Sequence, residues 1–313
     1  MYNPCVNASS LHPARSPQIR RWPFHGWLGL GLVAVFWPLN WFLPGLRTQW
    51  LFFPLWLGYC LTVDALVLVR KGDSLLTRNP RRYAGLFLVS IPAWWLFEVL
   101  NSRTLNWVYQ GAEYFTPLQF AVLASISFST VVPAVFGTAE LVGTLPRLGR
   151  SGSGPVIPST RRVLIGFFFA GWAGLGLLLA WPDIFFPLVW VSPYFILAPL
   201  NVWLGNRSLA DDVARGDWRP VLALWGGVLI CGFFWEMWNF YSYPRWVYHV
   251  PYLGGLHVFE MPLLGFGGYL PFSLELFAIY QLVAGSFDRA SARDFLRLLP
   301  ERAGDGGSQP GGS

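Results

Sequence analysis

The chain has 313 residues, of which 54% are hydrophobic and only 12% are charged, and its mean hydropathy is +0.44. Soluble domains carry roughly 25% charged residues, so this composition excludes an ordinary soluble protein and indicates a membrane protein. The formal net charge of +6 suits basic loops beside anionic lipid headgroups, so we expect membrane lipids as partners and no nucleic acid.

Eight apolar stretches are close to the roughly 20 residues that a helix needs to cross a bilayer. The first follows a polar leader without the small-residue cleavage site of a signal peptide, so we expect it to be retained. Interior prolines are compatible with spans, because neighbouring helices satisfy the backbone groups that proline leaves free. We predict an all-α, polytopic fold with spans at about 27–44, 50–69, 84–101, 117–141, 163–181, 184–204, 220–240 and 258–284.

The basic residues give this topology an orientation, because Lys and Arg collect in cytoplasmic loops. With eight spans, one side receives the leader, the loops at 70–83, 142–162 and 205–219, and the tail. That side holds all of the 22 basic residues except Arg47, Arg103 and Arg245. We therefore expect a multi-pass protein of the cell membrane with both termini in the cytoplasm.

A glutamate followed three positions later by an asparagine occurs in two spans, as Glu98 with Asn101 and as Glu236 with Asn239. This spacing puts both side chains on one face of a helix. A Trp-Val-Tyr segment follows each pair, at residues 107–109 and 246–248. Repetition of both patterns in the same order predicts two copies of one structural unit.

The predicted units contain four spans each, and an even number makes them parallel repeats about an axis along the membrane normal. We divide the chain into a cytoplasmic leader (1–26), a first unit (27–148), a Gly/Ser/Pro linker (149–162), a second unit (163–285) and a cytoplasmic tail (286–313). Asp64 lies near the cytoplasmic end of its span, where we expect it to contact the basic loop that follows.

The glutamates need an explanation, because a carboxylate within the bilayer costs a few kcal/mol at least and normally faces a partner or a cavity. An apolar environment favours the protonated carboxyl, which is what a general acid needs. The alternative is that each glutamate bonds its own helix neighbours, or sits among headgroups near the end of its span, and fixes the packing of the two units. The candidate catalytic residues are Glu98, Glu236 and Glu260, and the candidate substrate-binding residues are Asn101, Asn239, Trp107, Tyr109, Trp246, Tyr248 and Glu275.

The aromatic content of 18 Trp, 26 Phe and 12 Tyr is the second unusual feature. Aromatic faces stabilise cations by roughly 0.5 to 2 kcal/mol each, so an aromatic cavity with a buried acid suits carbocation chemistry on an apolar small molecule. Most of these rings are expected to pack the core or to anchor the chain at the membrane interface.

Signals for a metal or a cofactor are weak. His257 and Glu260 are spaced for one helix face, with His249 nearby, but the first unit has no matching histidine, so we predict no metal site. The three cysteines form no pair or CxxC motif. A Walker A sequence, a dinucleotide loop and a serine hydrolase elbow are all absent from the sequence, so we expect no cofactor.

The second unit contains Glu236 and Asn239, then Trp-Val-Tyr at 246–248, Leu-Gly-Gly-Leu at 253–256 and Phe-Glu-Met-Pro at 259–262. This order resembles the integral-membrane lycopene cyclase domain and the related membrane carotenoid hydratases, which pair an aromatic loop with a Pro-x-Glu-Glu type segment opening a helix. The order here is Glu-Met-Pro, and the first unit lacks that glutamate. The resemblance implies acid-catalysed chemistry on an isoprenoid, with Glu260 nearest to the acidic segment of the family.

Two classes of function therefore remain open. The first is an enzyme of cyclase or hydratase type that acts on an isoprenoid or lipid. The second is a transporter or binding protein with its site between the repeats, because parallel repeats with interrupted helices suit such sites. A purely structural membrane component is a third.

Overall fold

The computed structural model describes residues 21–150 and 152–299. The predicted leader up to residue 20 and the predicted tail from residue 300 onward lie outside the described residues. Within them, seven helical segments are long and apolar enough to cross a membrane: Thr48–Lys71, Pro80–Thr104, Pro117–Gly143, Arg161–Ala180, Pro182–Trp203, Arg219–Phe240 and Leu263–Phe287. The prediction of an all-α, multi-pass membrane protein is confirmed at this level. The first predicted span is also a helix, α1 (Phe24–Phe42), but it is not among the seven, so the count of eight stays a prediction.

Three of these segments are interrupted. The segment 117–143 consists of α5 (Pro117–Phe128) and α6 (Val131–Gly143), and the Ser90 hydroxyl bridges the break. It accepts a hydrogen bond from the Val132 amide at 3.0 Å and donates to the Phe128 carbonyl at 2.5 Å. A neighbouring helix thus satisfies backbone groups that the break frees within the bilayer.

The other two interruptions are short 3₁₀ segments. Before α10 (Ser192–Trp203), the chain forms α9 (Pro182–Phe185) and η2 (Phe186–Trp190). Before α13 (Tyr269–Phe287), it forms η3 (Leu263–Gly268). The last span was expected to begin near residue 258, but the α-helix begins only at Tyr269, because Pro262 and the glycines of η3 disfavour an α-helix.

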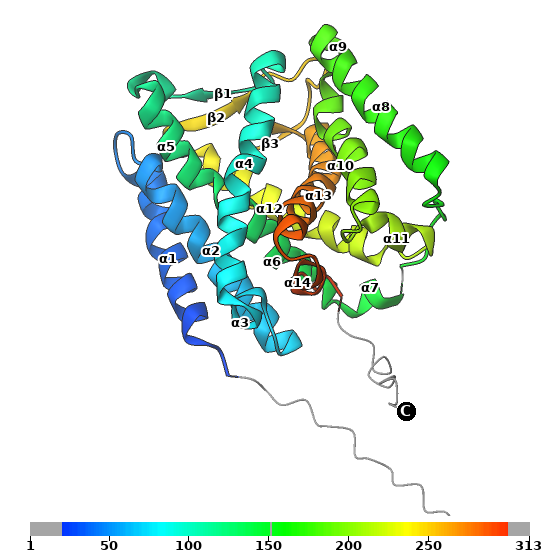
Figure 1. The fold of residues 1–313 in the computed structure, drawn as a ribbon. Coiled ribbons are helices and arrows are strands. Elements are labelled where there is room, and N and C mark those ends of the chain that lie inside the picture. Colours follow the sequence, from blue (N-terminus) through cyan, green and yellow to red (C-terminus); the bar gives the residue numbers. More distant parts are fainter. Residues whose placement is uncertain (1–20, 151, 300–313) are drawn as a thin grey trace, which may run out of the picture.

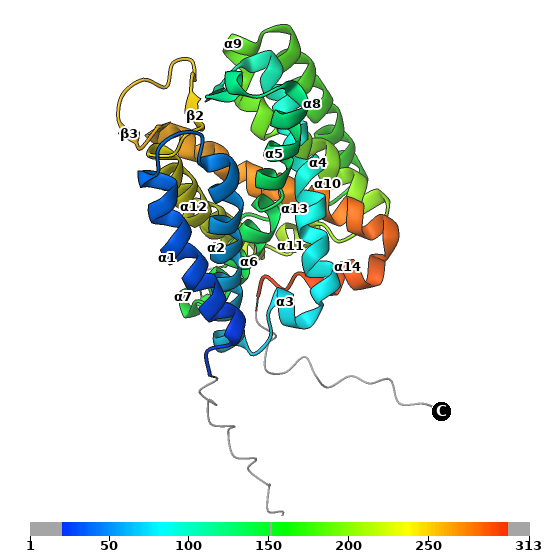
Figure 2. The same cartoon turned by 90° about the vertical axis from the view of Figure 1, so that its left-hand side faces the viewer.

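The centre of the bundle is formed by α2 (Thr48–Lys71), α6 and α12 (Arg219–Phe240). Helix α6 is buried continuously from Val131 to Glu140. Helices α4 (Pro80–Thr104) and α13 pack around this centre, whereas α1 lies against α2 and α8 (Arg161–Ala180) lies against α10 on the opposite flank (Figures 1 and 2). The two flanks therefore belong to the two halves of the chain, residues 27–148 and 163–285.

The two ends of the bundle differ in character. One end carries a ribbon of β1 (Trp107–Gln110) and β2 (Arg245–Tyr248), the turn η1 (Ala112–Tyr114), and the hairpin of β3 (His257–Val258) and β4 (Met261–Pro262). We call it the ribbon end. The opposite end carries the short helices α3 (Leu75–Arg78), α7 (Pro146–Arg150), α11 (Leu209–Ala214) and α14 (Arg289–Phe295) (Figure 1). We call it the basic end.

A buried carboxylate organises the basic end. Glu140 accepts hydrogen bonds from Arg78 Nη1 at 2.9 Å, from Lys71 Nζ at 3.4 Å and from the Arg297 amide at 2.7 Å. Arg207 of the second half donates to the Leu296 carbonyl at 2.5 Å. The first part of the predicted tail is therefore held against this end by cations from both halves.

Two further expectations concern the basic end. Asp64 accepts from the Ser74 hydroxyl at 2.7 Å and from the Leu76 amide at 3.0 Å, so the expected contact with the following loop is confirmed. The predicted linker is attached to the start of α12, because Trp218 Nε1 donates to the Pro155 carbonyl at 2.8 Å.

Candidate functional site

The two asparagines of the repeated pattern fix the strands that follow them. Asn101 Nδ2 donates to the Trp107 carbonyl at 2.8 Å, and the Trp107 amide donates to Asn101 Oδ1 at 3.2 Å. Asn239 makes the same pair of bonds with Trp246, at 2.7 and 2.9 Å. The side-chain nitrogen and oxygen of each asparagine thus both bond to backbone atoms. The two side chains therefore position the ribbon and do not line a ligand site.

The ribbon joins the two halves with a reciprocal register. Strands β1 and β2 are antiparallel, with Trp107 opposite Tyr248, Tyr109 opposite Trp246, and Val108 opposite Val247. Each tryptophan therefore lies opposite the tyrosine of the other half. The ribbon brings both Trp-Val-Tyr segments to one place at the ribbon end.

Glu98 is bound by three aromatic donors. Its Oε1 accepts from Trp94 Nε1 at 2.8 Å, from Trp107 Nε1 at 3.0 Å and from the Tyr109 hydroxyl at 2.5 Å. These three donors come from α4 and β1 and converge on one oxygen. Glu98 therefore fixes the rings of β1 against α4.

Glu236 is arranged differently, although it occupies the matching place in α12. Its Oε1 accepts from the Tyr248 and Tyr269 hydroxyls, both at 2.7 Å. Trp246 Nε1 donates to the Tyr248 oxygen at 3.0 Å. The residue is fully buried, and its Oε2 has no hydrogen-bond partner within the described part of the chain.

A glycine explains the difference between the two glutamates. Trp94 lies one helical turn before Glu98, and Gly232 lies at the same distance before Glu236. A Cβ atom on Gly232 would lie 2.7 Å from the Tyr269 ring. The missing side chain therefore leaves the space in which Tyr269 reaches Glu236 in place of a tryptophan.

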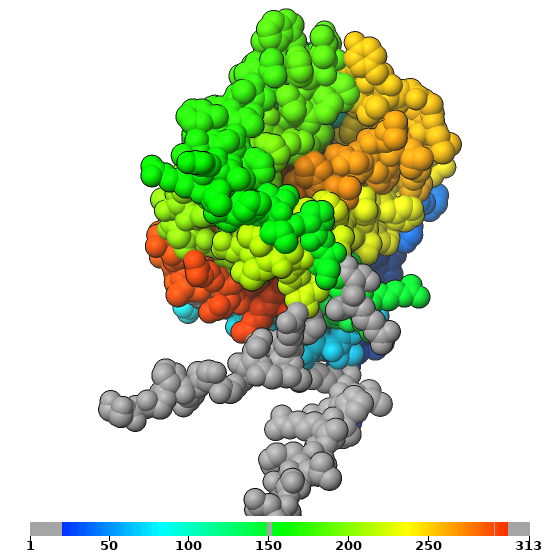
Figure 3. Space-filling view, turned by 90° about the vertical axis from the view of Figure 1, so that its right-hand side faces the viewer, coloured from blue at the N-terminus to red at the C-terminus, as the bar shows by residue number. Residues whose placement is uncertain are grey.

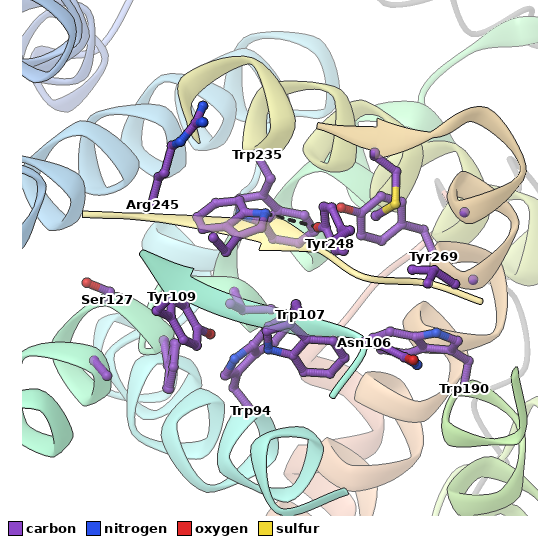
Figure 4. Close-up of a pocket in the computed structure, with 18 of the residues that line it drawn as sticks. Trp94, Asn106, Trp107, Tyr109, Ser127, Trp190, Trp235, Arg245, Tyr248 and Tyr269 are labelled. Carbon is purple, nitrogen blue, oxygen red and sulfur yellow. Dashed lines mark hydrogen bonds between the residues drawn. The ribbon is translucent and has the colours of Figure 1, made fainter. Parts of the chain in front are cut away.

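A cavity of about 480 Å³ lies between the halves at the ribbon end. Figure 4 shows Trp94, Trp107 and Tyr109 on one side of it, and Trp235, Tyr248 and Tyr269 on the other. Among the sequence-predicted residues, Trp107, Tyr109, Trp246 and Tyr248 line the cavity. The lining does not include Glu98, Glu236, Glu260, Glu275, Asn101 or Asn239. The two glutamates of the repeated pattern lie behind the aromatic wall, one hydrogen bond from the space.

The tyrosine hydroxyls of the ribbon stay protonated over a wide pH range. Burial, and then the charge on the neighbouring glutamate, raise the pKa of Tyr109 and of Tyr248 well above the ordinary value of 10.0. Both residues lie outside the candidate spans. They therefore remain hydrogen-bond donors at physiological pH.

Glu260 and Glu275 lie in other environments. Glu260 accepts from Arg245 Nη1 at 2.7 Å, and Arg245 is a lining residue of the cavity. Glu275 is fully buried in α13, and neither of its oxygens has a hydrogen-bond partner within residues 21–150 and 152–299. The structure therefore brings neither residue to the tyrosines that surround Glu236.

Three residues of the site were not predicted from the sequence. Trp94 had a usable signal, because it lies four residues before Glu98 on the same helix face. Tyr269 had none, because it comes 33 residues after Glu236. Trp190 of η2 stacks on Trp107 with ring centroids 5.8 Å apart, and this contact crosses between the halves.

Within the described ranges, no group of three or more His, Cys, Asp or Glu side chains is placed to hold a metal ion. Comparison with known protein families, curated proteins and solved structures found no match to this chain.

Proposed function

We propose that the protein is a membrane enzyme that transfers a proton to an apolar isoprenoid or lipid in the cavity between its halves. One observation supports this most directly. The hydroxyls of Tyr248 and Tyr269, two residues of the cavity wall, both bind one oxygen of Glu236, whose second oxygen has no partner among the described residues.

The lining favours an apolar ligand with few polar groups. Aromatic and aliphatic side chains from α5, η2, η3, α13 and the ribbon form most of the wall. Trp94, Trp107, Trp190, Trp235 and Trp246 all contribute to it. Their faces would each stabilise a positive charge by roughly 0.5 to 2 kcal/mol. A cavity of this kind suits a hydrocarbon chain that becomes cationic during the reaction.

The proton would reach the ligand through a tyrosine. When Glu236 is protonated, its carboxyl O–H donates to the oxygen of Tyr248 or Tyr269, and the O–H of that tyrosine is free to turn into the cavity. Protonation of a carbon–carbon double bond then moves the tyrosine proton to carbon and the carboxyl proton to the tyrosine oxygen. The carboxylate and a carbocation remain. Loss of a proton back along this route completes isomerisation, or cyclisation if a second double bond of the ligand has first attacked the cation. In hydration, water adds to the cation and one proton of the bound water then returns along the same route to Glu236.

The three candidate catalytic glutamates would have different tasks in this reaction. Glu98 already has three donors on one oxygen and is suited to hold the rings of β1 in place. Glu260 is paired with Arg245 and is suited to fix the β3–β4 hairpin. We therefore propose Glu236 as the general acid. The reaction would be of the cyclase or hydratase type that the sequence resemblance implies.

The test compares lipid extracts from the native host with the gene deleted and then restored as wild type or as a variant. Glu236→Gln keeps shape and acceptor capacity but removes the transferable proton, so we expect the product to disappear and its precursor to accumulate. Glu275→Gln is the matched control, since that glutamate is equally buried and has no contact with the two tyrosines, and we expect wild-type conversion. An unchanged isoprenoid and lipid profile on deletion, or full conversion by Glu236→Gln, would refute the proposal.

A transporter is the second candidate, and the interrupted helices favour it. The cavity wall includes η2 and η3, both of which interrupt apolar segments, and broken helices surround substrate sites in many transporters. A transporter predicts an altered distribution of its ligand across the membrane, with no new product in the extract. The same deletion strain decides between the two.

We further propose that the halves are two parallel four-span repeats, with eight spans in the cell membrane and both termini in the cytoplasm. Asn101 and Asn239 make matching bonds, and the reciprocal register of β1 with β2 is what a two-fold axis midway between Val108 and Val247 would produce. The concentration of arginine and lysine at the basic end supports a cytoplasmic location for that end.

A further inference from the structure

The side of the bundle between η2 and the β3–β4 hairpin combines a cavity mouth with exposed apolar side chains. Leu264 of η3 lines the cavity and is nevertheless 74% exposed. Pro187 of η2 and Gly267 of η3 are also both lining residues and exposed. Residues that belong to the wall and to the surface mark the place where the cavity opens. The opening thus lies between two 3₁₀ segments at the side of the bundle.

The mouth is bordered by an apolar lip, which we define as Tyr252, Leu256, Leu263 and Leu264. Tyr252 is 83% exposed and Leu256 is 72% exposed. No Asp, Glu, Lys or Arg occurs between Val250 and Phe259, although this stretch lies outside the candidate spans. An exposed apolar group of this kind marks an interaction site. Figure 3 shows this side, with the loop that bears the lip in gold beside the orange start of α13.

The lip is held in place by the structure behind it. Strand β3 pairs with β4, and the Leu263 amide donates to the Leu256 carbonyl at 2.9 Å. Phe259 at the hairpin tip packs on Phe233 and Phe240 of α12, with ring centroids 5.7 Å away in both cases. The four apolar side chains are therefore presented outward by a braced hairpin, close to the end of one span and the beginning of the next.

We propose that this lip inserts into the lipid leaflet at the ribbon end and that the cavity opens there sideways into the bilayer. Lipid fits this surface better than a protein partner, because the lip lacks charge, includes an interfacial tyrosine, and is continuous with the apolar start of the span Leu263–Phe287. An apolar ligand would then enter from the leaflet without crossing water. This inference stands whether or not Glu236 performs chemistry.

The first experiment locates the lip by spin labelling of the full chain in liposomes. Cys5 is replaced by serine, whereas Cys60 and Cys231 are buried and are kept. Labels at Leu256→Cys and Leu264→Cys should be reached by oxygen dissolved in the bilayer in preference to a water-soluble nickel chelate. A label at the exposed Glu113→Cys on η1 should show the reverse order. Nickel access at the lip equal to that at position 113 would overturn the proposal, and exclusion of both reagents would indicate a second copy of the chain instead.

The second experiment tests the opening with an aryl diazirine dissolved in the bilayer, which labels neighbouring side chains on illumination. In the wild type, label is expected on the lip and also on β2 inside the cavity. Gly267→Phe places a ring in the mouth, where a Cβ meets no atom within 4 Å, and should abolish the label on β2 while the lip stays labelled. Gly254→Phe is the matched control, because its Cβ is equally unobstructed and it does not line the cavity. Absence of label on β2 in the wild type, or its persistence in Gly267→Phe, would refute a lateral opening.

Discussion

Glu140 and Glu275 offer a paired test of how buried charge stabilises this protein. Both side chains are fully buried, but Glu140 has two cationic partners, and Glu275 has no hydrogen-bond partner in the described part of the chain. The partners of Glu140 are themselves largely buried, with exposed side-chain fractions of 8% for Lys71 and 11% for Arg78. Glutamine has the same shape as glutamate, so Glu140→Gln and Glu275→Gln make one chemical change in two environments.

The expected losses of unfolding free energy differ by about 2 kcal/mol or more. Removal of one partner from a buried ion pair costs roughly 3–5 kcal/mol, because the remaining charge is left uncompensated. Glu140→Gln should fall near the lower limit, about 3 kcal/mol, since the amide oxygen still accepts one hydrogen bond. Glu275→Gln breaks no ion pair and removes only a group that is costly to bury, so the unfolding free energy should change by less than about 1 kcal/mol or rise.

The assay is unfolding of the full chain in mixed micelles by SDS titration, followed by tryptophan fluorescence and circular dichroism. Glu140→Gln should also loosen the segment from α14 to Leu298, which protease cleavage after Arg293 or Arg297 would report. Equal losses of stability in the two variants would refute the reasoning, because burial alone would then decide the cost and the partners of Glu140 would not matter.

Three further predictions follow from the site and the topology. Gly232→Ala places a methyl group against the Tyr269 ring, so thermal unfolding should show a loss of about 1–3 kcal/mol and lipid conversion should fall with it. The pKa of Tyr248 is raised in the folded state above its value near 10.0 in the unfolded chain. The contribution of Tyr248 to stability is therefore complete below pH 10.0 and is lost as the pH rises above that value. Tyrosinate absorbance from this residue should appear only with unfolding. Cysteines placed in the loop 205–219 should be labelled from the cytoplasmic side only, and labelling from outside would contradict the topology.

The repeated Glu-x-x-Asn pattern predicted the part of the site in which contacts form between residues close together in the sequence. The spacing of Glu98 and Asn101 put both on one face of α4, and the structure uses them together to hold the strand that follows. The same holds for Glu236 and Asn239. Asp64 was expected to contact the loop after its own helix, and it does. In each case the partner lies within a few residues of the end of the helix, where backbone geometry limits the possibilities.

The sequence pattern did not predict contacts between residues of distant segments. The pairing of β1 with β2 joins residues of the two halves. Each strand is only four residues long, too short to show the alternation of polar and apolar residues by which a strand is predicted. Tyr269 follows an interrupted segment, and its contact depends on the space above Gly232. Helical periodicity shows which face of a helix is polar, but it does not say which other helix supplies the second group.

The difference between the two glutamates is the strongest reason to place chemistry in one half only. In Glu98, one oxygen receives three N–H or O–H donors, so the position is suited to a structural task. In Glu236, both donors are hydroxyls that can reverse their hydrogen bonds, and Trp246 Nε1 donates to Tyr248. A carboxyl that is to gain and lose a proton needs such reversible partners. The exchange of Trp94 in one half for Gly232 and Tyr269 in the other therefore replaces an N–H donor by a hydroxyl, which is the kind of partner that the proposed proton transfer needs, while the asparagine and the ribbon stay the same.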